Sequence, residues 1–334
     1  MKNALVTGAS GFLGGHLVAA LCRAGVPVRT LVRATSDVRR LVGLGVETVA
    51  GDLSDPDSLV RACQGREVVF HVAAKVPDWG ARREFFRVNA EGTAALVAAC
   101  QAAGVSRLVL VSSLTVLGLS RSGAEVDEDT PYDPSPRDAY TASKIQAEKI
   151  VREAHGQRGL STVVVRPGAI WGPGDVHIAP RVAALLRRGR ALYISGSRNS
   201  VALSHVDNLV AGLLLAAESS ASGVYHLTDG QMVTARELID GLAELLGVPA
   251  PRRSVPFFFI YAVACLMEDM ARLLRRPTPP LLTRYGVRLL ASHGFYNNRK
   301  AERDLGYRPT VGWRESLAAL APELQSQFPV VSGA

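Results

Sequence analysis

The sequence predicts an α/β protein whose main part is a doubly wound parallel sheet. Through the first half of the chain, short apolar runs alternate with stretches of helical periodicity, and the first run leads into a glycine-rich turn. Strands that are apolar throughout and alternate with helices indicate a parallel sheet covered on both faces through right-handed crossovers. We expect six strands, near residues 3–7, 26–33, 46–52, 67–74, 107–116 and 160–168, with one long helix over 85–104.

The chain departs from this pattern after Gly168. Proline and glycine cluster in residues 166–175, and helical segments then mix with short apolar runs. We therefore expect a main domain formed by residues 1–170 and about 204–228. A smaller, mixed substrate-binding lobe is expected from about 171–203 and 229–334.

Composition narrows the class of protein. Of the 334 residues, 48% are hydrophobic and 20% are charged, which suits a well-packed globular protein. The net charge of +8 comes from scattered basic pairs and not from a tail, so we expect no nucleic-acid partner; an anionic cofactor or an anionic membrane surface would suit it. The four cysteines form no C-x-x-C pair and no signal peptide is evident, which favours a cytoplasmic protein without a metal site.

The glycine-rich turn has the features of a dinucleotide-binding site. It follows the first strand and opens the first helix, and its residues are Gly8, Ala9, Ser10, Gly11, Phe12, Leu13 and Gly14. Gly8 permits a tight turn, Gly11 lets the backbone approach a pyrophosphate, and Gly14 lets the helix pack close to the sheet. The helix N-terminus supplies unpaired N–H groups and a positive dipole end.

A tyrosine and a lysine four positions apart form the candidate catalytic pair. Tyr140 and Lys144 lie in "AYTASKIQAEK", which favours a helix and would place both side chains on one face. A tyrosine hydroxyl has an unperturbed pKa near 10, and a nearby ammonium would lower it. Tyr140 can then act as a general acid in reduction and as a base in oxidation.

The glycine spacing and the Tyr-x-x-x-Lys pair together resemble the short-chain dehydrogenase/reductase superfamily, in its extended or atypical branch. The resemblance implies an NAD(P)-binding Rossmann domain and adds Ser113 to Tyr140 and Lys144, as the group that would hydrogen-bond the reacting oxygen. Further cofactor contacts are implied at the carboxyl ends of the strands. They are Arg33, Asp52, Leu53, Ala73, Ala74, Lys75, Asn89, Ser112, Pro167, Gly168 and Ile170.

The residue after the second strand bears on the choice of nicotinamide cofactor. An acid there would hold the adenosine ribose and favour NAD, whereas a base would accept a 2′-phosphate. Arg33 occupies this position, so NADP is favoured over NAD, although the guanidinium could also stack on adenine. Asp52 would lie near the adenine edge, or would cap the helix that begins near Asp55.

The apolar run from Phe257 to Met267 bears on the substrate. Eleven residues are too few to span a bilayer. The segment 256–276 is a core helix, a lid over a lipophilic substrate, or a helix that contacts a membrane peripherally, and the last two are compatible.

This segment, "HVAAKVPDWG" and "RPGAIWGPGD" are similar to the 3β-hydroxysteroid dehydrogenase/isomerase family and its bacterial relatives, the 2-alkyl-3-ketoacid reductases. The resemblance implies interconversion of a ketone and a secondary alcohol on a hydrophobic molecule, such as a steroid or a long-chain β-keto compound. It places Lys75, Trp79, Thr115 and Trp171 around the substrate pocket. A homodimer through the fourth helix and the Tyr140 helix is expected by analogy.

Two alternatives stay open at the level of sequence. A nucleotide-sugar 4-epimerase would need an arginine where residues 201–203 are apolar, although Arg198 could substitute for it. A non-catalytic NAD(P)-sensing protein would not require the set Ser113, Tyr140 and Lys144.

Overall fold

The computed structural model describes residues 1–76, 79–119 and 125–328. Its centre is a seven-stranded sheet with the strand order β12-β7-β5-β4-β1-β2-β3, in which every neighbouring pair is parallel. The strands are β1 (Ala4–Thr7), β2 (Val28–Val32), β3 (Glu47–Ala50), β4 (Val68–His71), β5 (Arg107–Val111), β7 (Ser161–Pro167) and β12 (Gly223–Leu227). The predicted doubly wound α/β fold is confirmed.

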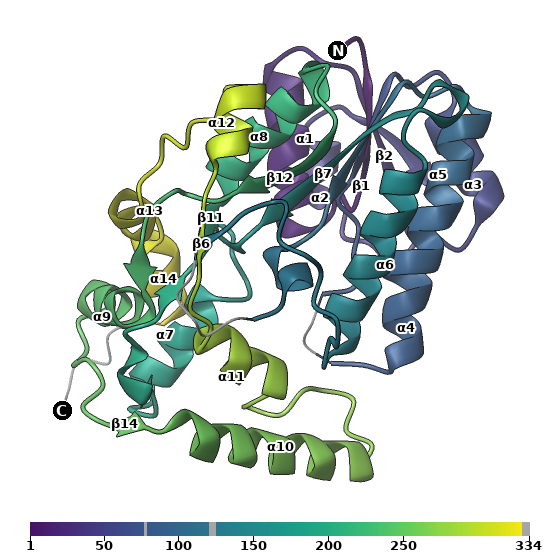
Figure 1. Ribbon diagram of the computed structural model, residues 1–334. Helices are drawn as coiled ribbons and strands as arrows, with labels where there is room; N and C mark the ends of the chain where they lie inside the picture. The colour runs from purple at the N-terminus through teal and green to yellow at the C-terminus, as the bar shows by residue number, and fades with distance from the viewer. Residues whose placement is uncertain (77–78, 120–124, 329–334) are drawn as a thin grey trace.

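Helices cover both faces of this sheet (Figure 1). One apolar core joins the sheet to α1 (Phe12–Arg23), α8 (Val206–Glu218) and α12 (Arg299–Leu305). The other joins it to α3 (Pro56–Cys63), α5 (Gly92–Ala102) and α6 (Ala139–Glu153). The short helix α2 (Arg39–Val42) packs near α1.

The long helix expected over residues 85–104 begins earlier and changes its winding. It consists of α4 (Arg82–Phe86), a π-helical turn (Arg87–Glu91) and α5. A π-turn shifts the side chains that follow it relative to a regular helix, and such turns often occur at functional sites. Asn89, one of the predicted cofactor contacts, lies within it.

The smaller part of the structure contains two apolar clusters. The first surrounds the buried side chains of Trp171 and Tyr193 and includes α7 (Ala179–Arg187), α9 (Ala235–Leu246), α13 (Trp313–Ala319) and α14 (Ala321–Gln327). The second joins α10 (Phe257–Leu273) to α11 (Arg284–Leu290), which lie side by side below the rest of the molecule in Figure 1.

Four two-stranded pairs complete the secondary structure, three parallel and one antiparallel. They are β8 (Ala169–Trp171) with β11 (Leu203–His205), β9 (Tyr193–Ile194) with β14 (Ser254–Val255), β15 (Phe295–Tyr296) with β6 (Glu125–Val126), and the antiparallel pair β10 (Ser200–Val201) with β13 (Val233–Thr234). The seventh strand of the main sheet, β12, lies within the segment that we expected to return to the main domain.

The helix α10 buries little of its apolar surface. Ile260, Ala264 and Ala271 pack inward, whereas Phe258 is 72% exposed and Leu266 is 64% exposed. The helix α10 is therefore part of a core on one side only, because helical spacing reveals an apolar face but not what covers it. In the described part of the chain, no helix is both long enough and apolar enough to cross a membrane.

Candidate active site

The glycine turn forms a close-packed cradle between β1 and α1. Gly8 has a φ of +73°, and a Cβ on it would lie 2.7 Å from the backbone nitrogen of Ala73. A Cβ on Gly14 would lie 2.1 Å from the Gly8 carbonyl oxygen. Gly11 precedes α1 and offers no side-chain cap, so the first N–H groups of the helix remain available to an anion. The cradle fits the pyrophosphate of a dinucleotide.

Arg33 and Asp52 are the charged residues at the predicted position of the adenosine part of the cofactor. Arg33 is exposed directly after β2, and its charge contributes to lowering the pKa of Asp52, although hydrogen bonds from Ser54 contribute more. The Asp52 carboxylate accepts from the Ser54 backbone N–H at 2.9 Å. Asp55, and not Asp52, caps α3 by accepting from the Ser58 N–H at 3.2 Å.

Asn89 links three segments of the site. Its side-chain oxygen accepts from the Lys75 N–H at 2.7 Å, and its side-chain nitrogen donates to the Lys75 carbonyl at 3.1 Å. The same nitrogen donates to the hydroxyl of Ser143 at 2.9 Å, on the helix that carries Tyr140 and Lys144. Asn89 therefore fixes the loop after β4 against the catalytic helix, whatever contact it makes with a cofactor.

The three candidate catalytic residues lie together at the end of β5. Ser113 follows the strand and begins a short 3-10 helix, Leu114–Leu117. Its side chain is hydrogen-bonded to the Tyr140 side chain. Lys144 is buried, and its ammonium donates to the Val111 carbonyl at 2.6 Å. The Asp138 carboxylate caps the helix by accepting from the Thr141 N–H at 2.8 Å.

Burial shifts the proton affinity of both titratable residues. Burial raises the pKa of Tyr140 to about 12, and its hydrogen bond with Ser113 partly offsets this. Burial lowers the pKa of Lys144 to about 8, and the charge of Glu148, one turn further along α6, opposes this. The expected lowering of the Tyr140 pKa is therefore not seen in the chain itself, because desolvation of the phenolate outweighs the hydrogen bond with Ser113 and the charge of Asp138 raises the pKa further. The arrangement holds a protonated tyrosine beside a lysine that titrates close to neutral pH.

The remaining predicted residues fall into two groups. Several of the predicted cofactor contacts lie at or just after the carboxyl ends of strands of the main sheet. Gly168 comes close to the backbone: its N–H donates to the Ser204 hydroxyl at 2.9 Å, and a Cβ on it would lie 2.4 Å from the Ala202 oxygen. The buried hydroxyl of Ser112 has no hydrogen-bond partner among the described residues, which suits a position beside a bound group. Of the others, Ser10 lies in the glycine turn, Phe12 and Leu13 begin α1, Leu53 and Ala74 follow β3 and β4, Pro167 ends β7, and Ile170 lies within β8.

Two of the predicted pocket residues have other positions. Trp171 is fully buried in the core of the smaller lobe, where its indole N–H donates to Asp229 at 3.2 Å, so the prediction that it lines the pocket mouth is wrong. In the sequence, a large apolar ring beside glycines is compatible with lining a pocket and with burial in a core. The packing of α7 and α9 around Trp171 buries it in the core. Thr115 is also buried and supports Ser113, donating to its hydroxyl oxygen at 3.1 Å.

Two cavities adjoin the catalytic helix. The larger, about 810 Å³, is lined by Tyr140 and Tyr285, whose rings meet edge to face at 6.1 Å, and by Lys75 and Trp79. The Trp79 indole N–H donates to the Arg276 carbonyl at 2.9 Å, which joins this wall to the segment after α10. Lys75 and Trp79 thus line a cavity that also contains Tyr140.

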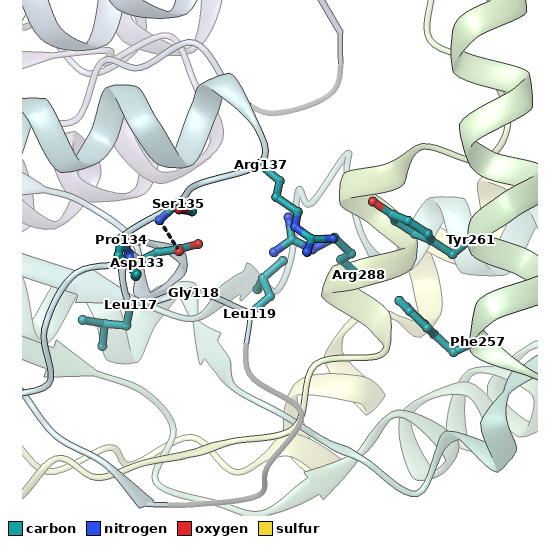
Figure 2. Close-up of a pocket in the computed structure, with 10 residues that line it drawn as sticks. All are labelled: Leu117, Gly118, Leu119, Asp133, Pro134, Ser135, Arg137, Phe257, Tyr261 and Arg288. Carbon is teal, nitrogen blue, oxygen red and sulfur yellow. Dashed lines mark hydrogen bonds between the residues drawn. The ribbon is translucent and has the colours of Figure 1, made fainter.

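The smaller cavity, about 450 Å³, lies between the loop after the 3-10 helix, the segment before α6, and helices α10 and α11 (Figure 2). Its lining includes Arg137, Arg288, Phe257 and Tyr261. The sequence did not single out either arginine. The only available signal for Arg137 was its place three residues before Tyr140, and Arg288 comes from a distant part of the chain.

Comparison with known proteins agrees with this geometry. The model of the 3-beta hydroxysteroid dehydrogenase/isomerase family matches residues 5–231. A ketoreductase of 4-hydroxy-2-methyl-3-oxo-4-farnesyl-3,4-dihydroquinoline-1-oxide from Stigmatella aurantiaca is 37% identical, with 94% of each chain covered. A 2-alkyl-3-oxoalkanoate reductase from Stenotrophomonas maltophilia is 34% identical over 95% of this chain and 97% of its own.

Solved structures share the whole architecture. The crystal structure of gox2253 superimposes with a TM-score of 0.80 at 31% identity, covering 98% of this chain and 99% of that one. MoeE5 in complex with UDP-glucose and NAD gives a TM-score of 0.76 at 26% identity, covering 97% and 99%.

The fold and the grouping of Ser113, Tyr140 and Lys144 at the end of β5 are those of an extended short-chain dehydrogenase/reductase, an NAD(P)-dependent oxidoreductase. Within that class, the chain belongs to the 3-beta hydroxysteroid dehydrogenase/isomerase family.

Proposed function

We propose that this protein is an NAD(P)-dependent reductase or dehydrogenase that interconverts a ketone and a secondary alcohol on a hydrophobic substrate. The observation that carries the proposal is the grouping of Ser113 and Tyr140 beside buried Lys144, at the end of β5 and at the wall of the cavity of about 810 Å³. The names of the two relatives reported above describe ketone substrates that carry apolar groups, a farnesyl chain and a 2-alkyl chain.

Each side chain has a separate task in the proposed reaction. Ser113 orients the substrate oxygen by hydrogen bonding, and Tyr140 donates a proton to that oxygen as negative charge develops on it. Lys144 supplies a positive charge one helical turn away, which stabilises the phenolate left after proton transfer. A nicotinamide dinucleotide held by the glycine cradle supplies the hydride. With a pKa of about 12, Tyr140 carries its proton at pH 7, as the acid of a reduction must.

NADP is the favoured cofactor. Arg33 is exposed at the end of β2, where a 2′-phosphate would lie, and the nearest acid along the chain, Asp37, is already paired with Arg39. Phosphate recognition by a guanidinium is both strong and directional.

We also propose a peripheral membrane contact through residues 256–276. The exposed apolar side chains of α10 face away from the rest of the lobe, and Arg272, Arg275 and Arg276 follow at its end. An apolar helix face next to arginines suits the interface of an anionic bilayer. Because α10 also contributes Phe257 and Tyr261 to the smaller cavity, a lipophilic substrate could pass from the bilayer towards the site.

A homodimer through α5 and α6 is proposed by analogy with the superfamily alone. Light scattering coupled to size-exclusion chromatography would test it, and a monomer at micromolar concentration would rule it out.

Removal of the hydroxyl oxygen of Tyr140 tests the main proposal. Tyr140→Phe removes the proton donor and leaves the ring, so it should abolish ketone reduction while the affinity for NADPH stays within about twofold of wild type. Ketone turnover that survives the change would refute Tyr140 as the acid. Tightly retained NAD with a response to UDP-sugars and no net turnover would instead favour the epimerase.

A further inference from the structure

We propose that His71 is a positioning residue that, as a neutral imidazole, joins the nucleotide cradle to the helix that carries Tyr140. This inference rests on the proposed function and goes beyond it, because it assigns a task in the reaction to a residue that lines neither cavity. His71 ends β4 and is 1% exposed. It lies between two threonines that are equally buried, Thr7 at the end of β1 and Thr93 in the first turn of α5.

The hydrogen bonds of the two threonines determine which ring nitrogen of His71 carries the proton. The Thr93 hydroxyl donates to the Asn89 carbonyl at 2.6 Å, so its single hydrogen is already in use. His71 Nε2 lies 2.9 Å from the same hydroxyl oxygen, and Nε2 must therefore carry the hydrogen that it donates. The Thr7 hydroxyl lies 2.8 Å from Nδ1, and its oxygen accepts from the Ala73 N–H at 3.3 Å. An Nδ1 without a proton accepts the Thr7 hydrogen, and every group then has a partner.

The neutral form of His71 is the one that satisfies these partners. In an imidazolium both ring nitrogens donate, and the hydroxyl hydrogen of Thr7 would be left without an acceptor in a dry interior. Burial, together with the charge of Lys144 on α6, lowers the pKa of His71 to about 3. The ring therefore stays neutral at physiological pH, with its proton on Nε2.

One end of these contacts lies at the nucleotide cradle. Thr7 directly precedes Gly8, the first glycine of the turn. A Cβ on Gly8 would lie 2.7 Å from the backbone nitrogen of Ala73, the same nitrogen that donates to Thr7. The Thr7 hydroxyl therefore holds the ends of β1 and β4 together where the backbone of the turn is packed most closely.

The other end lies at the backbone of Tyr140. Asn89, whose carbonyl accepts from Thr93, donates through its side-chain nitrogen to the Ser143 hydroxyl at 2.9 Å. Ser143 in turn donates to the Tyr140 carbonyl at 2.8 Å. Each side chain between the cradle and this carbonyl is at most 2% exposed. We call this set the His71 network, and it consists of Thr7, His71, Thr93, Asn89 and Ser143.

The proposed reduction needs the cradle and the catalytic helix in a fixed relation. The cradle holds the source of the hydride, and α6 holds the source of the proton, which is Tyr140. A displacement of about 1 Å between reacting groups can slow a reaction on the order of a hundredfold. The His71 network should therefore affect kcat much more than the affinity for the cofactor.

An isosteric variant interrupts the network without removing a group that the proposed reaction uses. In Thr93→Val, we expect kcat for ketone reduction to fall roughly ten- to a hundredfold while KM for NADPH stays within about threefold of wild type. Thr162→Val is the matched control, because Thr162 is also buried and its hydroxyl donates to the Val151 carbonyl at 3.0 Å, outside the network. The control should lose a similar amount of thermal stability and keep the wild-type kcat. An unchanged kcat in Thr93→Val, or an equal loss in both variants, would overturn the proposal.

The tautomer of His71 gives a test that needs no substrate. The full-length protein is labelled with ¹⁵N in its seven histidines and studied by NMR between about pH 6 and pH 9. The His71 signals are identified as those that disappear in His71→Gln and shift in Thr93→Val. We expect a neutral ring with the proton on Nε2 throughout this range. An imidazolium, or a proton on Nδ1, would overturn the proposal.

Two substitutions of His71 test the hydrogen bond to Thr93 directly. His71→Gln can place an amide N–H near the position of Nε2, so it should retain more of kcat than His71→Phe, which keeps a ring without hydrogen bonds. Equal kcat in these two variants would show that the hydrogen bond does not position the helix. If wild-type protein reduces no ketone at all, the proposed function fails, and the tautomer then judges the His71 network separately.

Discussion

Asn89 donates a hydrogen bond to Ser143 at 2.9 Å, which places the π-turn of the long helix directly against the residue before Lys144. The same amide makes two hydrogen bonds to the backbone of Lys75. The catalytic helix and the loop after β4 are therefore held together by one buried side chain.

Asn89→Ala should destabilise the protein by about 2–3 kcal/mol, because it leaves several buried polar groups without partners. Urea unfolding followed by circular dichroism measures the effect. Gln146→Ala, an exposed position on α6, is the matched control and should change the stability by less than about 0.5 kcal/mol. An Asn89→Ala protein with wild-type stability would show that the linkage is not energetically important.

Two neighbouring glycines give a sharp test of the cradle. A Cβ at position 14 would lie 2.1 Å from the Gly8 oxygen, whereas a Cβ at position 15 would lie 3.7 Å from the Ala9 oxygen, an ordinary contact. Gly14→Ala should cost about 3 kcal/mol or more and abolish NADPH binding. Gly15→Ala should bind NADPH normally and be neutral or slightly stabilising, since alanine favours the helix. Thermal unfolding measures the stability of both variants, and fluorescence titration measures their affinity for NADPH. Equal stability and equal affinity in the two variants would contradict the close contact between position 14 and the Gly8 oxygen.

Lys144 should reduce the stability of the protein at neutral pH. Its pKa is lowered from 10.5 to about 8 by burial, so the unfolded state binds more protons than the native state between these values. Stability must then rise with pH from about 8 to 10.5 on account of this group. Lys144→Met should be inactive, yet more stable than wild type by about 1–3 kcal/mol at pH 7, and this advantage should shrink towards pH 10.5.

Denaturant titrations at a series of pH values measure this difference, and taking the difference between the two proteins cancels the contributions of other groups. Lys149→Met, an exposed lysine on the same helix, should show no such pH dependence. A Lys144→Met protein that is less stable than wild type at every pH would mean that the hydrogen bond to Val111 outweighs the cost of burying the charge.

Arg33→Ala should change the choice of cofactor more than the rate of the reaction. Loss of a guanidinium from a 2′-phosphate should raise KM for NADPH roughly ten- to a hundredfold and leave KM for NADH nearly unchanged. Steady-state kinetics with each cofactor give the ratio, with Arg23→Ala as a control for net charge. If KM rises equally for NADPH and NADH, Arg33 contacts the adenine and not a phosphate.

The sequence alone predicted those helices and strands whose pattern lies within a short stretch of residues. The apolar runs marked the six strands β1, β2, β3, β4, β5 and β7 to within a few residues, and the glycine turn marked the start of α1. The π-turn at Arg87–Glu91 was not predictable, since nothing in its composition distinguishes it from regular helix. The helical spacing placed Tyr140 and Lys144 on one face of a helix, and the resemblance to short-chain dehydrogenases added Ser113 after β5.

Features that depend on packing between segments far apart in the chain could not be predicted from the sequence. Trp171 and Phe258 are both large and apolar, yet one is fully buried and the other is 72% exposed, because α7 and α9 enclose the first and no described segment covers the second. In the same way, Arg288 and Arg137 line one cavity because α11 lies beside the start of the catalytic helix, where Arg288 pairs with Asp138 at 3.7 Å.

The exposed face of α10 leads to the last prediction. Phe258, Leu266 and Leu273 are each more than 60% exposed, and the arginines at the end of the helix lie next to them. The protein should therefore float with vesicles that contain anionic lipid, and added salt should weaken the binding by screening the arginines. Phe258→Ser combined with Leu266→Ser should abolish flotation while reduction of a water-soluble ketone continues, because neither side chain lines either cavity. Val42→Ser, an equally exposed apolar residue next to α1, should float as wild type does. Wild-type protein that stays with the soluble fraction would show that α10 is not a membrane contact, and its apolar face would then have to be covered by protein.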